Sequence, residues 1–244
     1  MESSYVKVKT GIPGLDSIML GGLRQGRASV LLGPPGSGKT TFGMQYLYGG
    51  ANDFDEPGVF VTLSASPHQI KTDFMAYGWD IQKLIEQGKF LIIDARPFKM
   101  ERGFAVLDES LYSGEPLPFT HLTQLILNSL KRINAKRLVI DSLTVLAMQY
   151  SNKFYFRQGL QGMLQALEDQ CCTSILISEN SDHTKIDTEL YVASGIIILN
   201  HIQSENMMKR TLQVLKMRGM HHDDEIHPIK LGKAGLEIHS SFMP

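Results

Sequence analysis

One short run of residues constrains this chain more than any other. Residues 33–40 read Gly-Pro-Pro-Gly-Ser-Gly-Lys-Thr, which fits the phosphate-loop pattern G-x-x-x-x-G-K-[ST]. An apolar stretch, Ala28–Leu32, precedes the run, and a helix-like stretch from about Lys39 to Tyr48 follows it. Phosphate oxygens need several backbone N–H groups pointing at them, and glycines let the chain wrap closely enough to supply them. The context therefore predicts a strand, a phosphate-binding turn and a helix whose positive end faces the anion.

The residue types in and after this run suggest roles around a bound triphosphate and magnesium. We expect Lys39 to reach the β- and γ-phosphates as a catalytic residue, and the Thr40 hydroxyl to bind Mg²⁺. Asp141 closes a later apolar stretch, and we expect it to hold the Mg²⁺ through water. The residues expected to contact the nucleotide are Gly33, Pro34, Pro35, Gly36, Ser37, Gly38, Lys39, Thr40 and Thr41.

Apolar stretches alternate with helix-like stretches along most of the chain, which predicts an α/β fold with a mostly parallel sheet flanked by helices. The expected parallel strands are Ala28–Leu32, Gly58–Leu63, Lys89–Asp94, Arg137–Asp141 and Thr173–Ser178. The last 50 or so residues change character, because strand-like stretches follow one another without helices between them. We expect these stretches, Gly195–Asn200, Arg210–Met217 and Ile226–Leu231, to add antiparallel strands at one sheet edge. No linker divides the chain, so residues 1–244 are predicted to form a single domain.

Composition and local patterns exclude several other classes of protein. Apolar residues make up 43% and charged residues 20%, as in a globular domain. The longest apolar stretches are strand-sized, and residues 1–7 lack the core of a signal peptide, so we expect a cytoplasmic protein without a membrane partner. Arg96–Phe119 is irregular and is predicted to be a mobile surface loop, with a lid or a partner-binding segment as the alternative. The adjacent Cys171 and Cys172 are interpreted as two small buried residues between a helix and a strand.

Several motifs together resemble the KaiC/RadA-type domain of the RecA superfamily. They are Lys9–Asp16, Gly21–Arg27, the phosphate loop, Ser142–Thr144 after Asp141, and Arg210–Gly219. The resemblance runs from about Val6 to Ile238 and is strongest to the single-domain KaiC-like proteins of archaea and bacteria. It implies a RecA-like core that binds ATP with Mg²⁺ and forms a hexameric ring, a homo-oligomer with ATP between subunits.

The same resemblance implies further site residues near the end of the chain. Lys216 and Arg218 match the family's Lys-x-Arg, which reaches the γ-phosphate of the neighbouring subunit. In a strand these positions share one face, as a pair acting together would need; from the residues alone, two solvated cations on an edge strand remain the alternative. His222 falls where the family places a histidine that contacts the ribose.

The chain departs from the family where hydrolysis is concerned. The family usually carries two adjacent glutamates after the strand that follows the phosphate-loop helix, and one of them orients or activates the attacking water. Here Ser64 and Ala65 hold those positions, and no carboxylate occurs from Gly58 through Thr72. Losing a general base costs a factor of about 10² to 10⁴, so we expect hydrolysis to be weak or absent. Glu179 and His68 are the candidate substitute bases.

Three functions stay open at this stage. The first is an ATP-bridged ring with a signalling or assembly role and an unknown protein partner, and the second is an active ATPase that uses a relocated base such as Glu179. The third is a recombinase paralogue that binds DNA. The formal net charge is −1, and DNA binding is therefore not expected. The densest basic spot, residues 131–137, is read instead as a helix end and its loop.

Overall fold

The computed structural model describes residues 5–96, 118–179, 192–204 and 207–240. Nearly all of the irregular stretch predicted at 96–119 lies outside the described residues. Within them, no helix is long and apolar enough to cross a membrane.

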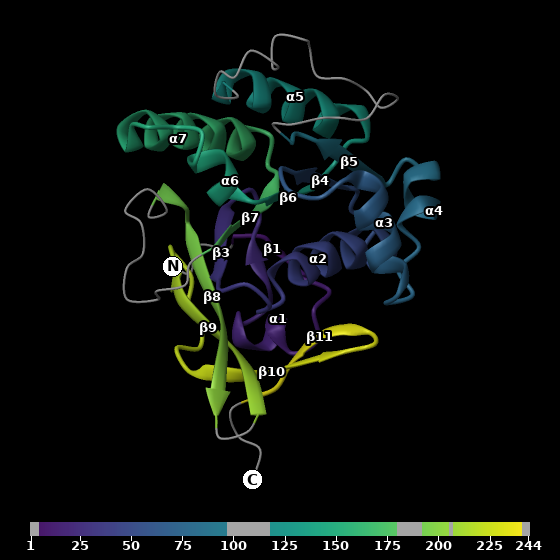
Figure 1. Cartoon of the computed structure of the whole chain (residues 1–244), viewed down its shortest axis with the longest axis vertical. Helices are drawn as coiled ribbons and strands as arrows, with labels where there is room; N and C mark the ends of the chain where they lie inside the picture. The colour runs from purple at the N-terminus through teal and green to yellow at the C-terminus, as the bar shows by residue number, and fades with distance from the viewer. Residues whose placement is uncertain (1–4, 97–117, 180–191, 205–206, 241–244) are drawn as a thin grey trace.

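A nine-stranded sheet forms the centre of the described structure (Figure 1). Its strands are β3 (Ala28–Gly33), β4 (Gly58–Thr62), β5 (Phe90–Asp94), β6 (Arg137–Asp141), β7 (Thr173–Glu179), β8 (Gly195–Ser204), β9 (Met207–Met217), β10 (Ile226–Gly232) and β11 (Gly235–Ile238). They lie in the order β11-β10-β9-β8-β3-β7-β6-β4-β5. A small antiparallel pair, β1 (Lys7–Val8) and β2 (Leu23–Arg24), stands apart from this sheet. Strands β3 to β7 are parallel to one another, as predicted.

The prediction for the last strands is wrong in one respect. Strand β8 runs parallel to β3, with Leu32 opposite Ile198, and the antiparallel part of the sheet begins only at β9. The reason lies in the burial of β8. Its apolar residues 196–199 are all buried, as in an interior parallel strand, whereas β10 alternates between buried and exposed residues.

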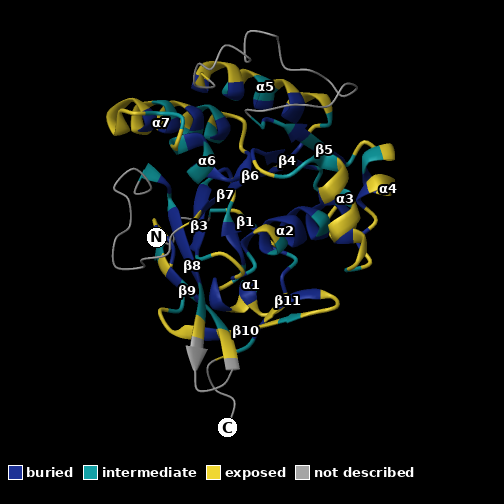
Figure 2. Ribbon diagram, in the orientation of Figure 1, coloured by how far each residue is buried: buried dark blue, intermediate teal, exposed yellow. Residues whose placement is uncertain are grey.

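Helices cover both faces of the sheet (Figure 1). One face packs against α5 (Phe119–Arg132), α6 (Leu143–Ala147) and α7 (Lys153–Asp169); the other packs against α1 (Leu15–Ile18), α2 (Lys39–Asp53), α3 (Pro67–Met75) and α4 (Ile81–Glu86). Successive strand residues point to opposite faces. Thus Leu31 packs on the α2 side, while Val30 and Leu32 pack on the α7 side. The central strands are buried throughout (Figure 2), which confirms the predicted α/β fold with helices on both faces.

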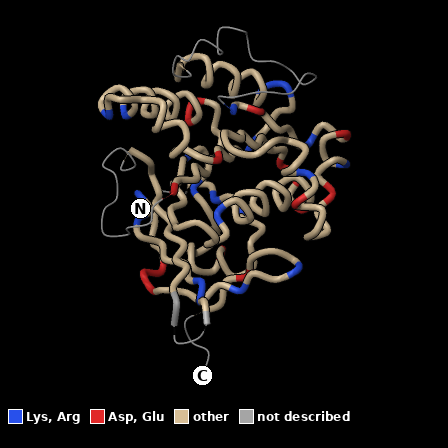
Figure 3. The backbone as a smooth tube through the Cα atoms, viewed as in Figure 1, with Lys and Arg blue, Asp and Glu red and all other residues tan. Residues whose placement is uncertain are grey.

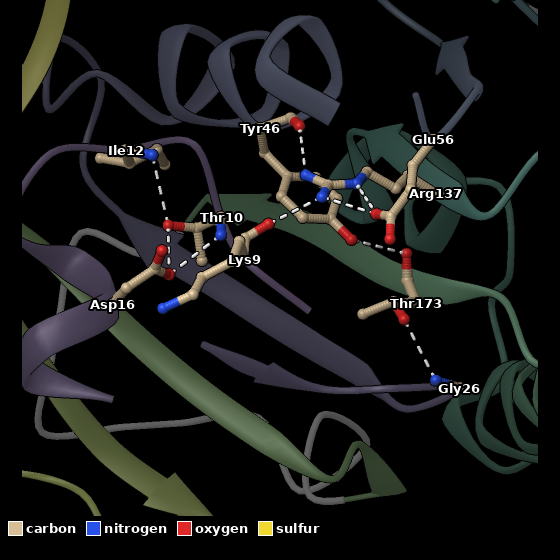
Figure 4. Close-up of polar contacts among 9 residues, drawn as sticks. All are labelled: Lys9, Thr10, Ile12, Asp16, Gly26, Tyr46, Glu56, Arg137 and Thr173. Carbon is tan, nitrogen blue, oxygen red and sulfur yellow. Dashed lines mark hydrogen bonds and ion pairs between the residues drawn. The ribbon is translucent and has the colours of Figure 1, made fainter. Parts of the chain in front are cut away.

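A buried arginine ties three parts of the fold together (Figure 4). Arg137, the first residue of β6, is 0% exposed. Its Nε donates to Glu56 Oε2 at 2.7 Å, Nη1 to the Tyr46 carbonyl at 2.9 Å, and Nη2 to the Lys9 carbonyl at 2.7 Å. The guanidinium also lies 4.6 Å from the centre of the Tyr46 ring. Arg137 therefore joins the sheet to α2 and to the N-terminal segment, at the end of β6 opposite Asp141.

The two cysteines do not share one environment. Helix α7 ends at Asp169 and β7 begins at Thr173, so both cysteines lie in the connection, as predicted. Cys172 is buried, and burial raises the pKa of its thiol to about 12. Cys171 is exposed, which contradicts the prediction for that residue. It has a φ of 53°, a turn conformation that directs the chain out of the helix at the surface.

Candidate nucleotide site

The glycine-rich run forms a loop between the carboxyl end of β3 and the start of α2. Gly36 and Gly38 have φ values of 78° and 99°, a left-handed backbone conformation that residues other than glycine rarely adopt. Gly33 is needed for a different reason, because a Cβ there would lie 2.5 Å from the Leu199 carbonyl oxygen. The buried Ser37 hydroxyl has no hydrogen-bond partner among the described residues. These features make a backbone cradle of the kind that surrounds phosphate.

Lys39 is held at the base of this loop. It is the first residue of α2, and its Nζ donates to the carbonyl oxygens of Gly33 at 2.8 Å and Pro34 at 2.9 Å. Burial lowers the pKa of Lys39, while the nearby charges of Glu179 and Asp141 act in the opposite direction. A buried ammonium whose hydrogen bonds go to neutral carbonyls gains from an incoming anion.

Thr40 and Asp141 form the pair expected for magnesium. Thr40 Oγ1 donates to Asp141 Oδ2 at 2.7 Å, so the hydroxyl and the carboxylate already lie together. Asp141 is 7% exposed, and burial raises its pKa, although the Thr40 hydrogen bond and the Lys39 charge act against that shift. Hydroxyl and carboxylate oxygens beside a phosphate cradle are the donors that Mg²⁺ prefers. The residues therefore fit a Mg²⁺-bound nucleotide.

Asp141→Asn is expected to raise the Tm of the nucleotide-free protein by about 2–4 °C, the shift that about 1 kcal/mol produces in a domain of this size. Burial disfavours the charged carboxylate, whereas asparagine is neutral and can still accept the Thr40 hydrogen bond. The pKa of Asp141 is raised in the folded chain, so the wild type gains stability relative to the variant as pH falls from this raised pKa toward 3.8. Differential scanning calorimetry from pH 7 to pH 4 measures the difference in Tm between the variant and the wild type, which should shrink as pH falls. A variant that melts below the wild type at pH 7 would contradict the prediction.

The candidate substitute bases lie in different places. Glu179 ends β7, beside Gly33 on β3, and its backbone N–H donates to Thr144 Oγ1 at 2.7 Å. His68 is exposed on the first turn of α3, after β4, which is three strands away from β3. Ser64 and Ala65 follow β4 next to Asp141, since the Leu63 N–H donates to the Asp141 carbonyl. Of the two candidates, Glu179 is the one whose charge acts on both Lys39 and Asp141.

Comparisons with known proteins agree with this geometry. The family model described as the KaiC ATPase matches residues 8–242. The chain belongs to the KaiC ATPase family. It is 36% identical over 238 residues to a UPF0273 protein of Methanocaldococcus jannaschii, and the match covers 96% of both chains. It is also 34% identical to a circadian clock oscillator protein KaiC of Prochlorococcus marinus over 236 residues, which is 95% of this chain and 45% of that protein.

A solved structure extends the likeness to the fold. The crystal structure of a KaiC-like protein from the hyperthermophilic archaeon Pyrococcus horikoshii matches with a TM-score of 0.83 at 30% identity. The match covers 97% of this chain and 100% of that one. The RecA-like fold is thereby confirmed, and membership of the KaiC ATPase family supports nucleotide binding.

In this KaiC-family chain the predicted cation pair lies far from its own phosphate loop. Lys216 of β9 pairs with Ile196 of β8, which in turn pairs with Val30 of β3. Gly33 lies three residues beyond Val30 on β3, and β3 is two strands away from β9. That offset is about 14 Å between Cα atoms. Lys216 Nζ also points away from the loop, to the Ala193 carbonyl at the amino end of β8. Burial and the nearby Arg218 charge both lower the pKa of Lys216.

Arg218 and His222, the other two residues expected to contact the nucleotide from this end of the chain, both lie after strand β9. Strand β9 ends at Met217, so Arg218 lies just beyond the strand, where Gly219 turns the chain with a φ of 72°. The strand end at Met217 agrees with the expected bounds Arg210–Met217, and the Arg218 backbone N–H still donates to the Ser194 carbonyl at 2.8 Å. His222 follows in the connection to β10, and its Nε2 lies 3.2 Å from Asp224. Its predicted contact with a ribose stays a prediction.

Lys and Arg positions are interspersed with Asp and Glu positions along the described backbone (Figure 3). The basic spot at residues 131–137 is weaker than its sequence suggests, because Arg137 is buried and paired with Glu56. Lys136 donates to Asn134 in the same loop. The structure thus offers this spot fewer cations for a DNA backbone than its four basic residues imply.

Sequence reasoning missed two residues that contact the site. Thr144 receives the Glu179 N–H, and its place in the Ser142–Thr144 motif was a signal that could have identified it. Arg210 donates from Nε to the Gly36 carbonyl at 3.1 Å. It lies 174 residues from Gly36, and although it opens the Arg210–Gly219 motif, that motif does not indicate a contact with the phosphate loop.

Proposed function

We propose that this protein binds ATP with Mg²⁺ and forms a ring in which each nucleotide bridges two chains, with slow or absent hydrolysis. The observation that supports bridging is the separation of Lys216 from its own phosphate loop. Lys216 and Arg218 are close enough that Arg218 lowers the pKa of Lys216, and such a pair gains from a shared anion. A phosphate on a second copy of the chain is the anion that the family's ring arrangement would bring there.

The weak hydrolysis follows from the positions after β4. Ser64 and Ala65 lie beside Asp141, where the family's glutamates would face the attacking water. Neither side chain can accept a proton as a carboxylate does. Retained ATP would then act mainly as a ligand that holds chains together. A ring of this kind suits a nucleotide-dependent assembly or signalling role with a protein partner.

Sedimentation velocity with and without ATP and Mg²⁺ tests the bridging. Wild-type protein is expected to assemble only with the nucleotide, and the double variant Lys216→Ala/Arg218→Ala to stay dispersed. Lys230→Ala/Lys233→Ala is the matched control, because it removes two exposed cations from the β10–β11 hairpin and should assemble normally. If the Lys216/Arg218 variant assembles like the control, the proposed bridging is wrong.

A second candidate, an active ATPase with Glu179 as the base, is favoured by one observation. Glu179 ends β7 next to the phosphate loop, and its charge acts on Lys39. Phosphate release measured in the same samples separates the two functions. Release that falls by a factor of about 10² or more in Glu179→Gln would favour the active ATPase. Wild-type release no faster than that of a phosphate-loop variant would favour the retained nucleotide.

A further inference from the structure

The tip of the phosphate loop is contacted from outside by the β8–β9 hairpin. Arg210 on β9 donates from Nε to the Gly36 carbonyl at 3.1 Å. His201 on β8 is the cross-strand partner of Arg210, and its Nδ1 lies 3.3 Å from where a Gly36 Cβ would be. One side chain thus bonds the tip and the other packs against it.

The hairpin reaches the tip because it extends past the end of β3. The last pair between β3 and β8 is Leu32 with Ile198, whereas β8 continues to Ser204 with β9 beside it (Figure 1). The part of β8 just beyond Ile198 therefore lies beside the loop rather than the strand, with the Leu199 carbonyl next to Gly33 and the His201 ring next to Gly36. The parallel direction of β8 makes this possible, since it carries the chain toward the carboxyl edge of the sheet.

Within the loop itself, the tip is held by one long turn hydrogen bond, which the Ser37 N–H donates to the Pro34 carbonyl at 3.3 Å. Lys39 anchors only the base of the loop, through the carbonyls of Gly33 and Pro34. Gly36 is exposed, has a left-handed backbone and brings no side chain of its own. The Gly36 carbonyl and the Ser37 N–H belong to one peptide plane, so fixing that oxygen also fixes the direction of the N–H.

We propose that Arg210 is a positioning residue that holds the phosphate loop in the shape that ATP needs. The inference rests on the proposed ATP binding and adds the residue that preorganises it. A loop fixed before binding loses less conformational entropy when the phosphates arrive, and its affinity is correspondingly higher. Arg210 acts through Gly36 and is not itself assigned a contact with the nucleotide.

Arg210→Ala tests this role, with Lys209→Ala as the matched control. Lys209 is the adjacent, exposed cation on the same strand, so both variants lose one positive charge from the same hairpin. We expect Arg210→Ala to raise the Kd for ATP about tenfold, the order of one charge-assisted hydrogen bond. In the nucleotide-free protein, hydrogen exchange of a peptide covering residues 33–40 is expected to speed up by a similar factor. Lys209→Ala should match the wild type in both measurements.

Salt separates positioning from simple attraction between charges. At about 1 M salt the Debye length is only about 3 Å, so a long-range effect of the Arg210 charge on ATP binding would disappear. A loss of affinity caused by the missing Gly36 contact would persist. Unchanged exchange in Arg210→Ala, an equal loss of affinity in Lys209→Ala, or a loss that salt abolishes would each overturn the proposal. A wild type that binds no ATP would contradict the proposed function instead, and the exchange comparison would still decide the role of Arg210 in the loop.

Discussion

Arg137→Met is expected to lower the free energy of unfolding by about 3–5 kcal/mol. Arg137 is fully buried, and its guanidinium donates to Glu56 and to the carbonyls of Lys9 and Tyr46 (Figure 4). Methionine replaces much of the stem, but it leaves those carbonyls without this donor and Glu56 without its cation. Urea unfolding followed by circular dichroism measures the change, with the slope m expected to stay constant.

Two comparisons make this result specific to the buried guanidinium. Arg132→Met removes an exposed arginine at the end of α5 and should change stability by less than about 0.5 kcal/mol. Glu56→Gln should cost only about 1 kcal/mol, because the Glu56 side chain is 32% exposed and the amide can still accept from Arg137. An Arg137→Met protein within about 1 kcal/mol of the wild type would contradict the idea that these bonds join β6, α2 and the N-terminal segment.

The core of the fold could be predicted because its signals are local. Each parallel strand is a short apolar run next to a helix-like stretch, and burial on both faces requires that pattern. The direction of β8 is a different kind of fact, since it depends on which strand lies beside it. Even so, an unbroken apolar run such as Ile196–Leu199 is typical of a strand buried on both faces, a signal that the prediction of an antiparallel edge strand did not use. The Arg137–Glu56 pair joins residues 81 apart and leaves no trace in either local pattern.

The candidate site divides in the same way. Residues 33–41 follow from a contiguous motif, and Asp141 follows from the end of a strand. The hydrogen bond between Arg210 and Gly36 depends on how far the β8–β9 hairpin extends past β3, which only the register reveals. That register also places Arg210 beside the phosphate loop, opposite His201, and Lys216 toward the other end of β9, opposite Ile196. Strand β9 thus contacts its own phosphate loop and carries a cation that we propose serves the next chain.

Lys39→Met is expected to weaken ATP binding at least about 100-fold, or by about 2.8 kcal/mol, without destabilising the nucleotide-free protein. The ammonium is the charged group that the motif assigns to the β- and γ-phosphates, and methionine has no proton to donate. Isothermal titration calorimetry with ATP and Mg²⁺ measures the loss. Lys233→Met, an exposed lysine in the β10–β11 hairpin, is the control and should bind as the wild type does. Equal affinity in the wild type and Lys39→Met would mean that ATP binds elsewhere or not at all.

The stability of the same variant provides an independent check on the environment of Lys39. Burial lowers the pKa of Lys39, so its charge is less favourable in the folded chain than in water, and Lys39→Met should melt no lower than the wild type at pH 7. As pH rises from the lowered pKa toward 10.5, folded Lys39 loses its proton first and the wild type gains stability relative to the variant. The gap in Tm should therefore narrow at alkaline pH. A variant that melts well below the wild type at pH 7 would instead indicate that Lys39 stabilises the empty loop through Gly33 and Pro34, and the loss of ATP binding would then reflect a misshapen loop rather than a missing charge.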